Sequence, residues 1–184
     1  NVLCCSFHLI HQVMNPPAKA FLFDLNGTMI DDMAYHVTAW NRIANELGAN
    51  LTKEQVKAEC YGKNGEVLER IFPARFSSEE KEEISIEKEK KYQLEFRPQL
   101  KLLNGLDKFL DATKEQNIKM SIGTAAIMFN VDFVLDGLNI RHYIDAIVSA
   151  DDVEYSKPHP ETFLKCADYL SIAYENCVVF EDAP

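Results

Sequence analysis

Four groups of polar residues follow short apolar segments of the chain, at positions where the strands of a parallel sheet would end. They are Asp24, Thr124, Lys157 and the adjacent pair Glu181 and Asp182. Taken one at a time, such residues are usually helix caps or solvated loop side chains. Together they offer a nucleophilic carboxylate, a hydroxyl, a cation and oxygen ligands for a hard metal ion, which is the equipment of phosphoryl transfer.

A phosphoryl group in transfer needs an in-line nucleophile and neutralisation of the charge on its other oxygens. Asp24 can serve as the nucleophile and form an aspartyl phosphate. A Mg²⁺ ion held by Asp24 and the acidic pair would let a phosphate approach despite its like charge, and Lys157 would add a compact cation. Thr124 and the backbone N–H of Ala125, which we expect to open the next helix, can hydrogen-bond the phosphate oxygens.

The elements that must position these residues alternate between strand and helix. Residues 20–23 form a short apolar run that is typical of a central parallel strand. Later in the chain we expect helices over residues 106–116, 127–138 and 160–170, and strands over residues 118–123, 144–149 and 177–180. This alternation predicts an α/β fold with a Rossmann-like parallel sheet, in which ligands bind beyond the carboxyl ends of the strands.

The segment between the first strand and this alternating part has a helical pattern throughout. Four helices are expected, beginning near Met33, Thr52, Glu66 and Ser77. Thr52 can cap the second helix, with Gln55 completing a capping box. Because no strand pattern interrupts these helices, we predict that residues 31–98 form a helical insertion in an α/β core made of residues 16–30 and 99–184.

Composition limits the classes of function. The chain has 184 residues, 47% of them apolar, and a formal net charge of −10. This charge argues against a nucleic-acid or anionic-membrane partner, but a small anionic substrate can still bind beside a local cation or metal. No apolar stretch approaches the ~20 residues that a membrane span requires. The five cysteines, an odd number without metal-ligand spacing, are typical of reduced thiols in the cytoplasm.

The two ends of the chain are unusual. Residues 1–15 lack the basic start and the cleavage site of a signal peptide, so we expect a disordered leader. Met14 is then a candidate start, and a truncated signal peptide is the alternative. The chain stops at Pro184, after a strand-like run where an open α/β sheet would continue with a helix. We therefore expect a C-terminally truncated chain.

The four polar groups carry a resemblance to a known family. Residues 24–28, Asp-Leu-Asn-Gly-Thr, resemble the first motif of the haloacid dehalogenase superfamily, Asp-x-Asp-Gly-Thr, with Asn26 in place of the second Asp. Thr124, Lys157 and the acidic pair match the second, third and fourth motifs. The Lys-Pro-x-Pro-Glu form of the third motif and the Phe-Glu-Asp ending are most similar to the β-phosphoglucomutase subfamily. The resemblance spans about residues 18–184.

The resemblance implies a four-helix cap over residues 31–98 and Mg²⁺ bound by Asp24, the backbone carbonyl of Asn26, Glu181 and Asp182. It also implies substrate contacts from residues that the helical segment supplies. These are His36 and Trp40, whose alternative role is burial in an apolar core, and Lys63 and Asn64 in the loop that reads the substrate. The phosphate-binding arginine of the mutase is not evident in that loop. Lys88 resembles a cap lysine that reaches the substrate, but its highly charged surroundings favour a solvated helix face.

Asn26 decides how active such a site can be. In the family the second acid of the first motif protonates the leaving oxygen and then activates the incoming water or sugar hydroxyl. A carboxamide can do neither, and loss of a general acid/base costs ~10²–10⁴ in rate. Asn26 is open to three interpretations: a substitution introduced to trap the enzyme, a natural residue of a slow enzyme or binding protein, or a site of deamidation to aspartate before Gly27.

The sequence therefore predicts a Mg²⁺-dependent phosphatase or phosphotransferase that acts on a small sugar phosphate through Asp24, with its activity impaired by Asn26. Hydrolase and mutase remain open, since a mutase differs in excluding water from the aspartyl phosphate. A phosphonatase is disfavoured because no residue of the first cap helix is placed to be its Schiff-base lysine, and a dehalogenase because it has no use for the acidic pair. The alternative is a catalytically silent sugar-phosphate-binding or regulatory protein.

Overall fold

The computed structural model describes residues 18–182, so the predicted leader and the chain end lie outside the described residues. Its centre is a parallel sheet with the strand order β3-β2-β1-β4. The strands are β1 (Ala20–Phe23), β2 (Lys119–Gly123), β3 (Ala146–Val148) and β4 (Cys177–Phe180). The predicted α/β fold with a parallel sheet is confirmed, and β1 and β4 have the predicted bounds.

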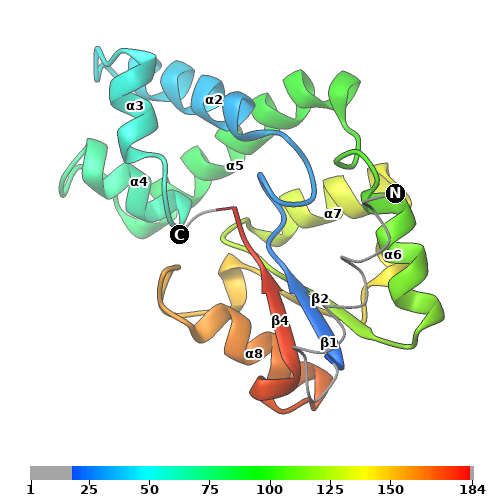
Figure 1. Cartoon of the computed structure of the whole chain (residues 1–184). Helices are drawn as coiled ribbons and strands as arrows, with labels where there is room; N and C mark the ends of the chain where they lie inside the picture. Colours follow the sequence, from blue (N-terminus) through cyan, green and yellow to red (C-terminus); the bar gives the residue numbers. More distant parts are fainter. Residues whose placement is uncertain (1–17, 183–184) are drawn as a thin grey trace, which may run out of the picture.

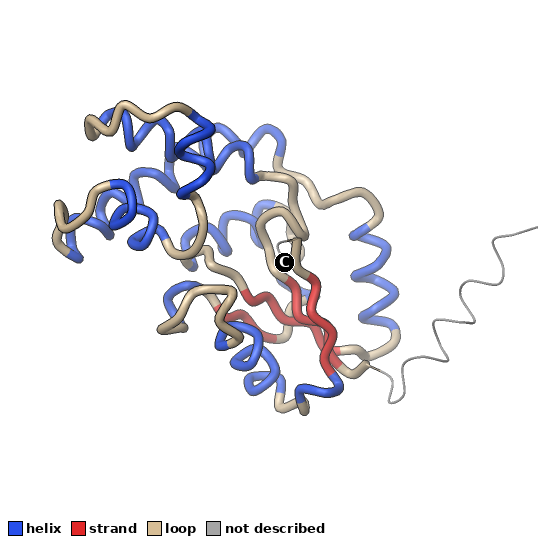
Figure 2. Tube along the Cα trace, turned by 60° about the vertical axis from the view of Figure 1, so that its left-hand side comes forward, coloured by secondary structure: helices blue, strands red, loops and turns tan. Residues whose placement is uncertain are grey.

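Helices cover both faces of the sheet (Figures 1 and 2). On one face, α6 (Leu106–Glu115) and α7 (Met128–Gly137) pack on Phe23 and Ile122 through Leu110 and Val134. On the other face, α8 (Glu161–Leu170) buries Cys166 against Leu22. Short 3₁₀ turns complete this part of the chain, at Arg97–Gln99, Arg141–Tyr143, Ala150–Asp152 and Tyr174–Asn176. The two turns that flank β3 shorten it relative to the strand predicted over residues 144–149.

Four helices follow one another between β1 and β2. They are α2 (Met33–Glu46), α3 (Lys53–Glu59), α4 (Asn64–Ile71) and α5 (Ser78–Phe96). Thr52 caps α3 in a capping box with Gln55, as predicted, and Ser77 caps α5 in the same way with Glu80. The helix predicted from Glu66 begins two residues earlier, because the Glu66 carboxylate accepts a hydrogen bond from the Lys63 backbone N–H and so closes the first turn.

The four helices have an apolar core of their own, made by Trp40, Ile43, Ala44, Val56, Val67, Leu68 and Phe72. Helix α5 also reaches the main core, where Tyr92 and Phe96 pack with Met29 and Ile30. Figure 1 shows the helices above the edge of the sheet at which β1 and β4 end. The division into a core and a helical insertion at residues 31–98 stays a prediction, which this separate core favours. Within residues 18–182 no helix combines the length and apolar character needed to cross a membrane.

Candidate active site

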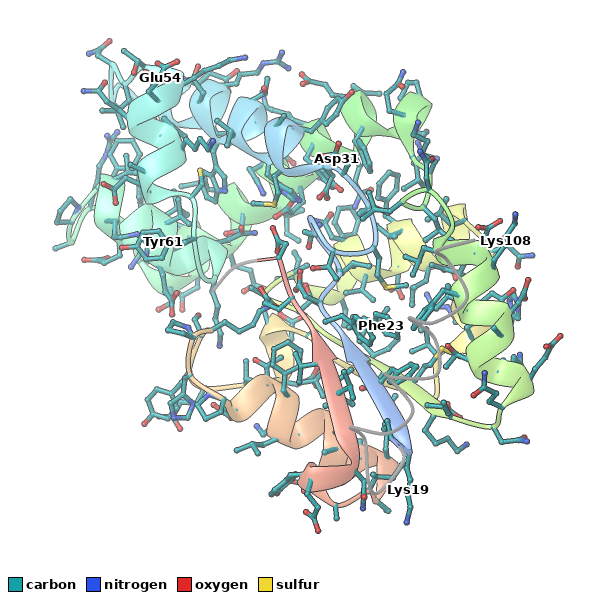
Figure 3. All side chains as sticks on the ribbon, in the orientation of Figure 1. Lys19, Phe23, Asp31, Glu54, Tyr61 and Lys108 are labelled. Atoms are coloured by element: carbon teal, nitrogen blue, oxygen red, sulfur yellow. The ribbon has the colours of Figure 1, made fainter. Side chains whose placement is uncertain are left out.

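A cavity of about 600 Å³ lies between the carboxyl edge of the sheet and the helices α2 to α5. In Figure 3, Lys19 and Phe23 mark the two ends of β1, and the cavity lies beyond the Phe23 end, toward Tyr61. The sheet side contributes Asp24, Asn26, Thr124, Ala125, Lys157, Glu181 and Asp182. The helical side contributes His36, Trp40, Asn64, Lys88 and Glu89. The register explains the sheet side, because Phe23 is opposite both Ile122 and Phe180 and the three strands therefore end together.

Asp24 is the buried carboxylate at the centre of the sheet side, with 4% of its surface exposed. The Lys157 ammonium donates to Asp24 Oδ1 at 2.6 Å and to Glu181 Oε2 at 2.8 Å. Burial raises the pKa of Asp24 to about 6, although Lys157 opposes the rise, and the nearby Glu181 adds to it. One cation therefore does not balance the charges at this point, and a further cation would favour the ionised, nucleophilic form of Asp24.

The donor atoms at this point fit a Mg²⁺ ion. Asp24, Glu181 and Asp182 each offer a carboxylate oxygen, and these oxygens lie within 4.8 Å of one another. Oxygen donors of this kind are the ligands that Mg²⁺ prefers. Gly27 makes room for the cluster: its φ is +83°, and a Cβ atom there would overlap with Asp182 Oδ2. A side chain at position 27 would therefore displace one of the three carboxylates.

Thr124 is almost fully buried and fixed by its neighbours. Its backbone N–H donates to the Val148 carbonyl at 2.9 Å, and its hydroxyl accepts from the Ala126 N–H at 3.1 Å. The same hydroxyl lies 3.5 Å from Asn26 Oδ1. The prediction that Ala125 opens the next helix is wrong, because a bend at residues 125–126 intervenes and α7 begins only at Met128. Ala125 nevertheless lines the cavity next to Thr124.

Asn26 is held by a second buried acid. Its Nδ2 atom donates to Asp32 Oδ2 at 2.6 Å and lies 3.2 Å from His36 Nε2. The Tyr92 hydroxyl also donates to Asp32 Oδ2, at 2.6 Å. Burial alone would raise the pKa of Asp32, but hydrogen bonds and charge from His36, with the bonds from Tyr92 and Asn26, lower it below its ordinary value. Position 26 thus faces a carboxylate oxygen, which suits an amide and would repel a second carboxylate.

On the helical side, His36 and Lys88 meet beside the cavity. Lys88 Nζ lies 2.7 Å from His36 Nδ1, and the His36 ring stacks on Tyr92 with a centroid separation of 3.9 Å. Lys88 is 2% exposed and lies 5.2 Å from the centroid of the Trp40 ring. The sequence left open whether Trp40 contacts the substrate or is buried in an apolar core. In the structure it belongs to the core of the helical segment and also lines the cavity.

Comparison with known proteins decides the family. A family model described as haloacid dehalogenase-like hydrolase matches residues 21–184. The chain belongs to this family. It is 31% identical over 173 residues to β-phosphoglucomutase of Bacillus subtilis, covering 90% of this chain and 75% of that protein. It is 28% identical over 166 residues to the fructose-1-phosphate phosphatase YqaB of Escherichia coli, covering 88% of this chain and 85% of that protein.

Solved structures agree with this assignment. The crystal structure of β-phosphoglucomutase from Clostridium difficile superposes with a TM-score of 0.80 at 31% identity, covering 90% of this chain and 77% of that one. The predicted resemblance and fold are confirmed, as is an enzyme of the phosphatase or phosphoglucomutase kind within the haloacid dehalogenase-like family.

Two predictions about the helical side of this haloacid dehalogenase-like site are wrong. Lys63 does not line the cavity, because its ammonium turns to the backbone carbonyls of Val153 and Glu154. Lys88 does not lie on a solvated face, because α5 buries it between Trp40 and Tyr92. Asn64, in contrast, lines the cavity beside Lys88 as expected.

Glu89 and Asp32 are site residues that the sequence reasoning missed. Glu89 lies in the charged run of α5, where its neighbours in sequence are lysines and glutamates, and nothing in that run marks it as buried. Asp32 offered a weak signal, since an acid just before a helix is normally read as its cap. The structure shows that the Asp32 carboxylate accepts no capping hydrogen bond from the backbone N–H groups of α2.

Proposed function

We propose that the protein is a Mg²⁺-dependent phosphatase or phosphotransferase that acts on a small sugar phosphate through an aspartyl phosphate on Asp24. One observation carries the proposal: the buried Asp24 carboxylate lines the sheet side of a 600 Å³ cavity, with the Lys157 ammonium 2.6 Å away and two further carboxylates beside it. A nucleophile, a fixed cation and a set of oxygen ligands are thus available at one point.

The residues divide the work as follows. Asp24 attacks the phosphorus atom, and Lys157 holds that carboxylate in place while it offsets charge on the phosphoryl oxygens. When bound by Asp24, Glu181, Asp182 and the Asn26 carbonyl oxygen, Mg²⁺ supplies the further positive charge that these oxygens need. The Thr124 hydroxyl and the Ala125 backbone N–H would donate hydrogen bonds to the phosphate from the end of the neighbouring strand β2.

The names of the relatives support a sugar phosphate as the substrate. They include a fructose-1-phosphate phosphatase and a hexitol phosphatase of Escherichia coli and a phosphorylated carbohydrates phosphatase of Thermotoga maritima. The acidic surface of the chain favours a small substrate over nucleic acid or an anionic membrane. The free thiols of Cys60, Cys166 and Cys177 are consistent with action in the cytoplasm.

Asn26 makes the turnover slow in this proposal. The amide cannot give a proton to the leaving oxygen or take one from water, and its Nδ2 atom is already committed to Asp32. The same observation favours a second candidate, a protein that binds a sugar phosphate and does not turn it over. The two candidates share the cavity and differ only in the rate of phosphate release.

Phosphate release from a panel of hexose and hexitol monophosphates, with and without Mg²⁺, tests the proposal. We expect slow Mg²⁺-dependent release by the chain itself and much faster release by Asn26→Asp. The variant that carries both Asn26→Asp and Asp24→Asn is the control, because it restores the acid but removes the nucleophile. Binding by Asn26→Asp with neither phosphate release nor phosphorylation of Asp24 would favour the silent binding protein, and neither binding nor release would contradict both candidates.

A further inference from the structure

The helical side of the cavity contains a charge pair that is nearly closed to solvent. Lys88 Nζ donates to Glu89 Oε1 at 2.9 Å, and the two side chains are 2% and 3% exposed. Burial would raise the pKa of Glu89, but the charges of Lys88 and His36 and the hydrogen bond from Asn64 outweigh it and lower that pKa below its ordinary value. The Glu89 carboxyl group is therefore ionised at neutral pH.

Glu89 is held in place from three helices. Its Oε1 atom accepts from Asn64 Nδ2 on α4 at 2.7 Å as well as from Lys88 on its own helix. Its Oε2 atom accepts from Asn130 Nδ2 on α7 at 2.5 Å. Asn130 is in turn fixed by Gln93, whose Nε2 donates to Asn130 Oδ1 at 2.8 Å. The carboxylate consequently cannot swing away from Lys88 when a ligand enters.

The charges on this side of the cavity cancel. Of the described residues that line it from α2 to α5, Lys88 and Glu89 carry formal charges and His36 is the remaining basic side chain. The His36 ring lies between Lys88 and the buried Asp32 carboxylate, which is 3.2 Å from His36 Nε2. The other lining side chains here are uncharged: Met33, Trp40, Cys60, Tyr61, Asn64 and Val67.

A neutral, hydrogen-bonding wall with an aromatic ring suits hydroxyl groups and does not suit a second anion. Placing a phosphate or carboxylate beside Lys88 would also place it beside Glu89, where repulsion and desolvation offset the attraction. Hydroxyl groups can both donate to a carboxylate and accept from an amide or an ammonium group. Specificity built in this way works by rejecting the wrong ligand as much as by binding the right one.

We propose that Glu89 is a specificity-determining residue that neutralises Lys88 and so restricts the cavity to phosphate monoesters whose remaining part is uncharged and polyhydroxylated. The inference rests on the proposed function, since it concerns the substrate of the same site. It separates this protein from an enzyme that must hold a sugar bisphosphate with one phosphate at each end of the cavity.

Calorimetric binding of fructose 1-phosphate and fructose 1,6-bisphosphate, with Mg²⁺ present, tests the assignment. The quantity measured is the ratio of the two dissociation constants for the wild type, Glu89→Gln, Lys88→Met and the double variant that carries both changes. Because local net charge decides the ratio, Glu89→Gln should shift it on the order of tenfold toward the bisphosphate, and Lys88→Met should shift it the other way. The double variant restores the net charge and should return close to the wild-type ratio.

A purely structural role for Glu89 gives a different pattern. Loosening of α5 would weaken both ligands alike in all three variants and leave the ratio unchanged, which would overturn the inference. Thermal unfolding of each variant reports folding separately, and the double variant retains the comparison if Glu89→Gln alone is unstable. If fructose 1-phosphate and the other monophosphates of the panel fail to bind the wild type, the proposed function falls. If they bind and the ratio does not follow net charge, only the role of Glu89 falls.

Discussion

The two sides of the cavity carry opposite kinds of electrostatics. On the sheet side, three carboxylates lie close together and one ammonium group pairs with two of them, so negative charge is in excess. Burial, with a smaller contribution from Glu181, raises the pKa of Asp24 to about 6 there. On the helical side, the charges of Lys88 and Glu89 cancel, and the amide groups of Asn64 and Asn130 donate hydrogen bonds to the Glu89 carboxylate. An excess of carboxylates is suited to binding a metal ion and, through it, a phosphoryl group. The helical side, whose charges cancel, is suited to the uncharged part of a phosphate monoester. In the proposed function, chemistry and recognition therefore belong to different layers of the fold.

The sheet side should fail completely when its nucleophile is removed. In a protein made active by Asn26→Asp, the additional change Asp24→Asn leaves the fold and the other ligands but no attacking carboxylate. We expect a loss on the order of 10⁴-fold or more in the rate of phosphate release, measured with an excess of substrate and Mg²⁺. Retention of more than a small part of the rate would show that another group is the nucleophile.

Restoring a carboxyl group at position 26 should raise turnover by ~10²–10⁴. The Asp32 contact adds a condition, because Asp32 Oδ2 lies 2.6 Å from Asn26 Nδ2 and two carboxyl groups so close share one proton. We therefore expect the double variant Asn26→Asp, Asp32→Asn to have a general acid/base with a lower pKa than Asn26→Asp alone. The pH dependence of kcat for the two variants measures this difference, and identical profiles would contradict the contact.

On the helical side, removing one member of the Lys88–Glu89 pair should lower the free energy of unfolding more than removing both members. Lys88→Met leaves the buried Glu89 carboxylate without its ammonium partner and should lower the free energy of unfolding by about 3–5 kcal/mol. Changing Glu89→Gln in the same protein removes the unpaired charge and should recover part of that loss. Urea unfolding of the two variants gives the comparison, and a larger loss in the double variant would mean that packing, not charge, dominates here.

The burial of Asp24 on the sheet side should also affect the stability of the protein. Burial raises the pKa of Asp24 from 3.8 to about 6, so between these values the folded metal-free protein binds more protons than the unfolded chain. Its free energy of unfolding should then fall as the pH rises through this window, by about 2–3 kcal/mol from this residue. Thermal unfolding in a chelator should show the trend, and Asp24→Asn should flatten it. A slope unchanged by Asp24→Asn would contradict the assignment.

The sheet side was predictable from sequence because strand ends fix it. In a parallel sheet the carboxyl ends of the strands lie at the same edge. Once the strands are recognised, Asp24, Thr124 and Glu181, which follow three of them, are therefore expected to lie close together. The helical side was harder, because helix α5 is charged on nearly every turn and only its neighbours decide which charges are buried. Lys88 and Glu89 are enclosed by Tyr92 of the same helix and by Trp40 and Asn130, which come from distant parts of the chain.

The residues at the start of α4 were the least predictable from sequence. Lys63 and Asn64 are adjacent in sequence, and no sequence pattern indicates that their side chains point in different directions. Their directions diverge because the backbone carbonyls of Val153 and Glu154 accept the Lys63 ammonium, while Glu89 accepts the Asn64 amide. Both partners are distant in sequence, so local propensities carry no information about them.

The most direct test of the central claim is a burst experiment with p-nitrophenyl phosphate and the protein as it is, with Asn26 in place. The leaving p-nitrophenolate needs no proton, so Asp24 can be phosphorylated without a general acid, whereas hydrolysis of the aspartyl phosphate still needs an activated water. We predict a Mg²⁺-dependent burst of about one p-nitrophenolate per protein molecule, followed by a slow phase, with the phosphoryl group mapped to the Asp24 peptide. Absence of a burst and of any phosphorylated peptide, or a phosphoryl group on another residue, would contradict Asp24 as the nucleophile.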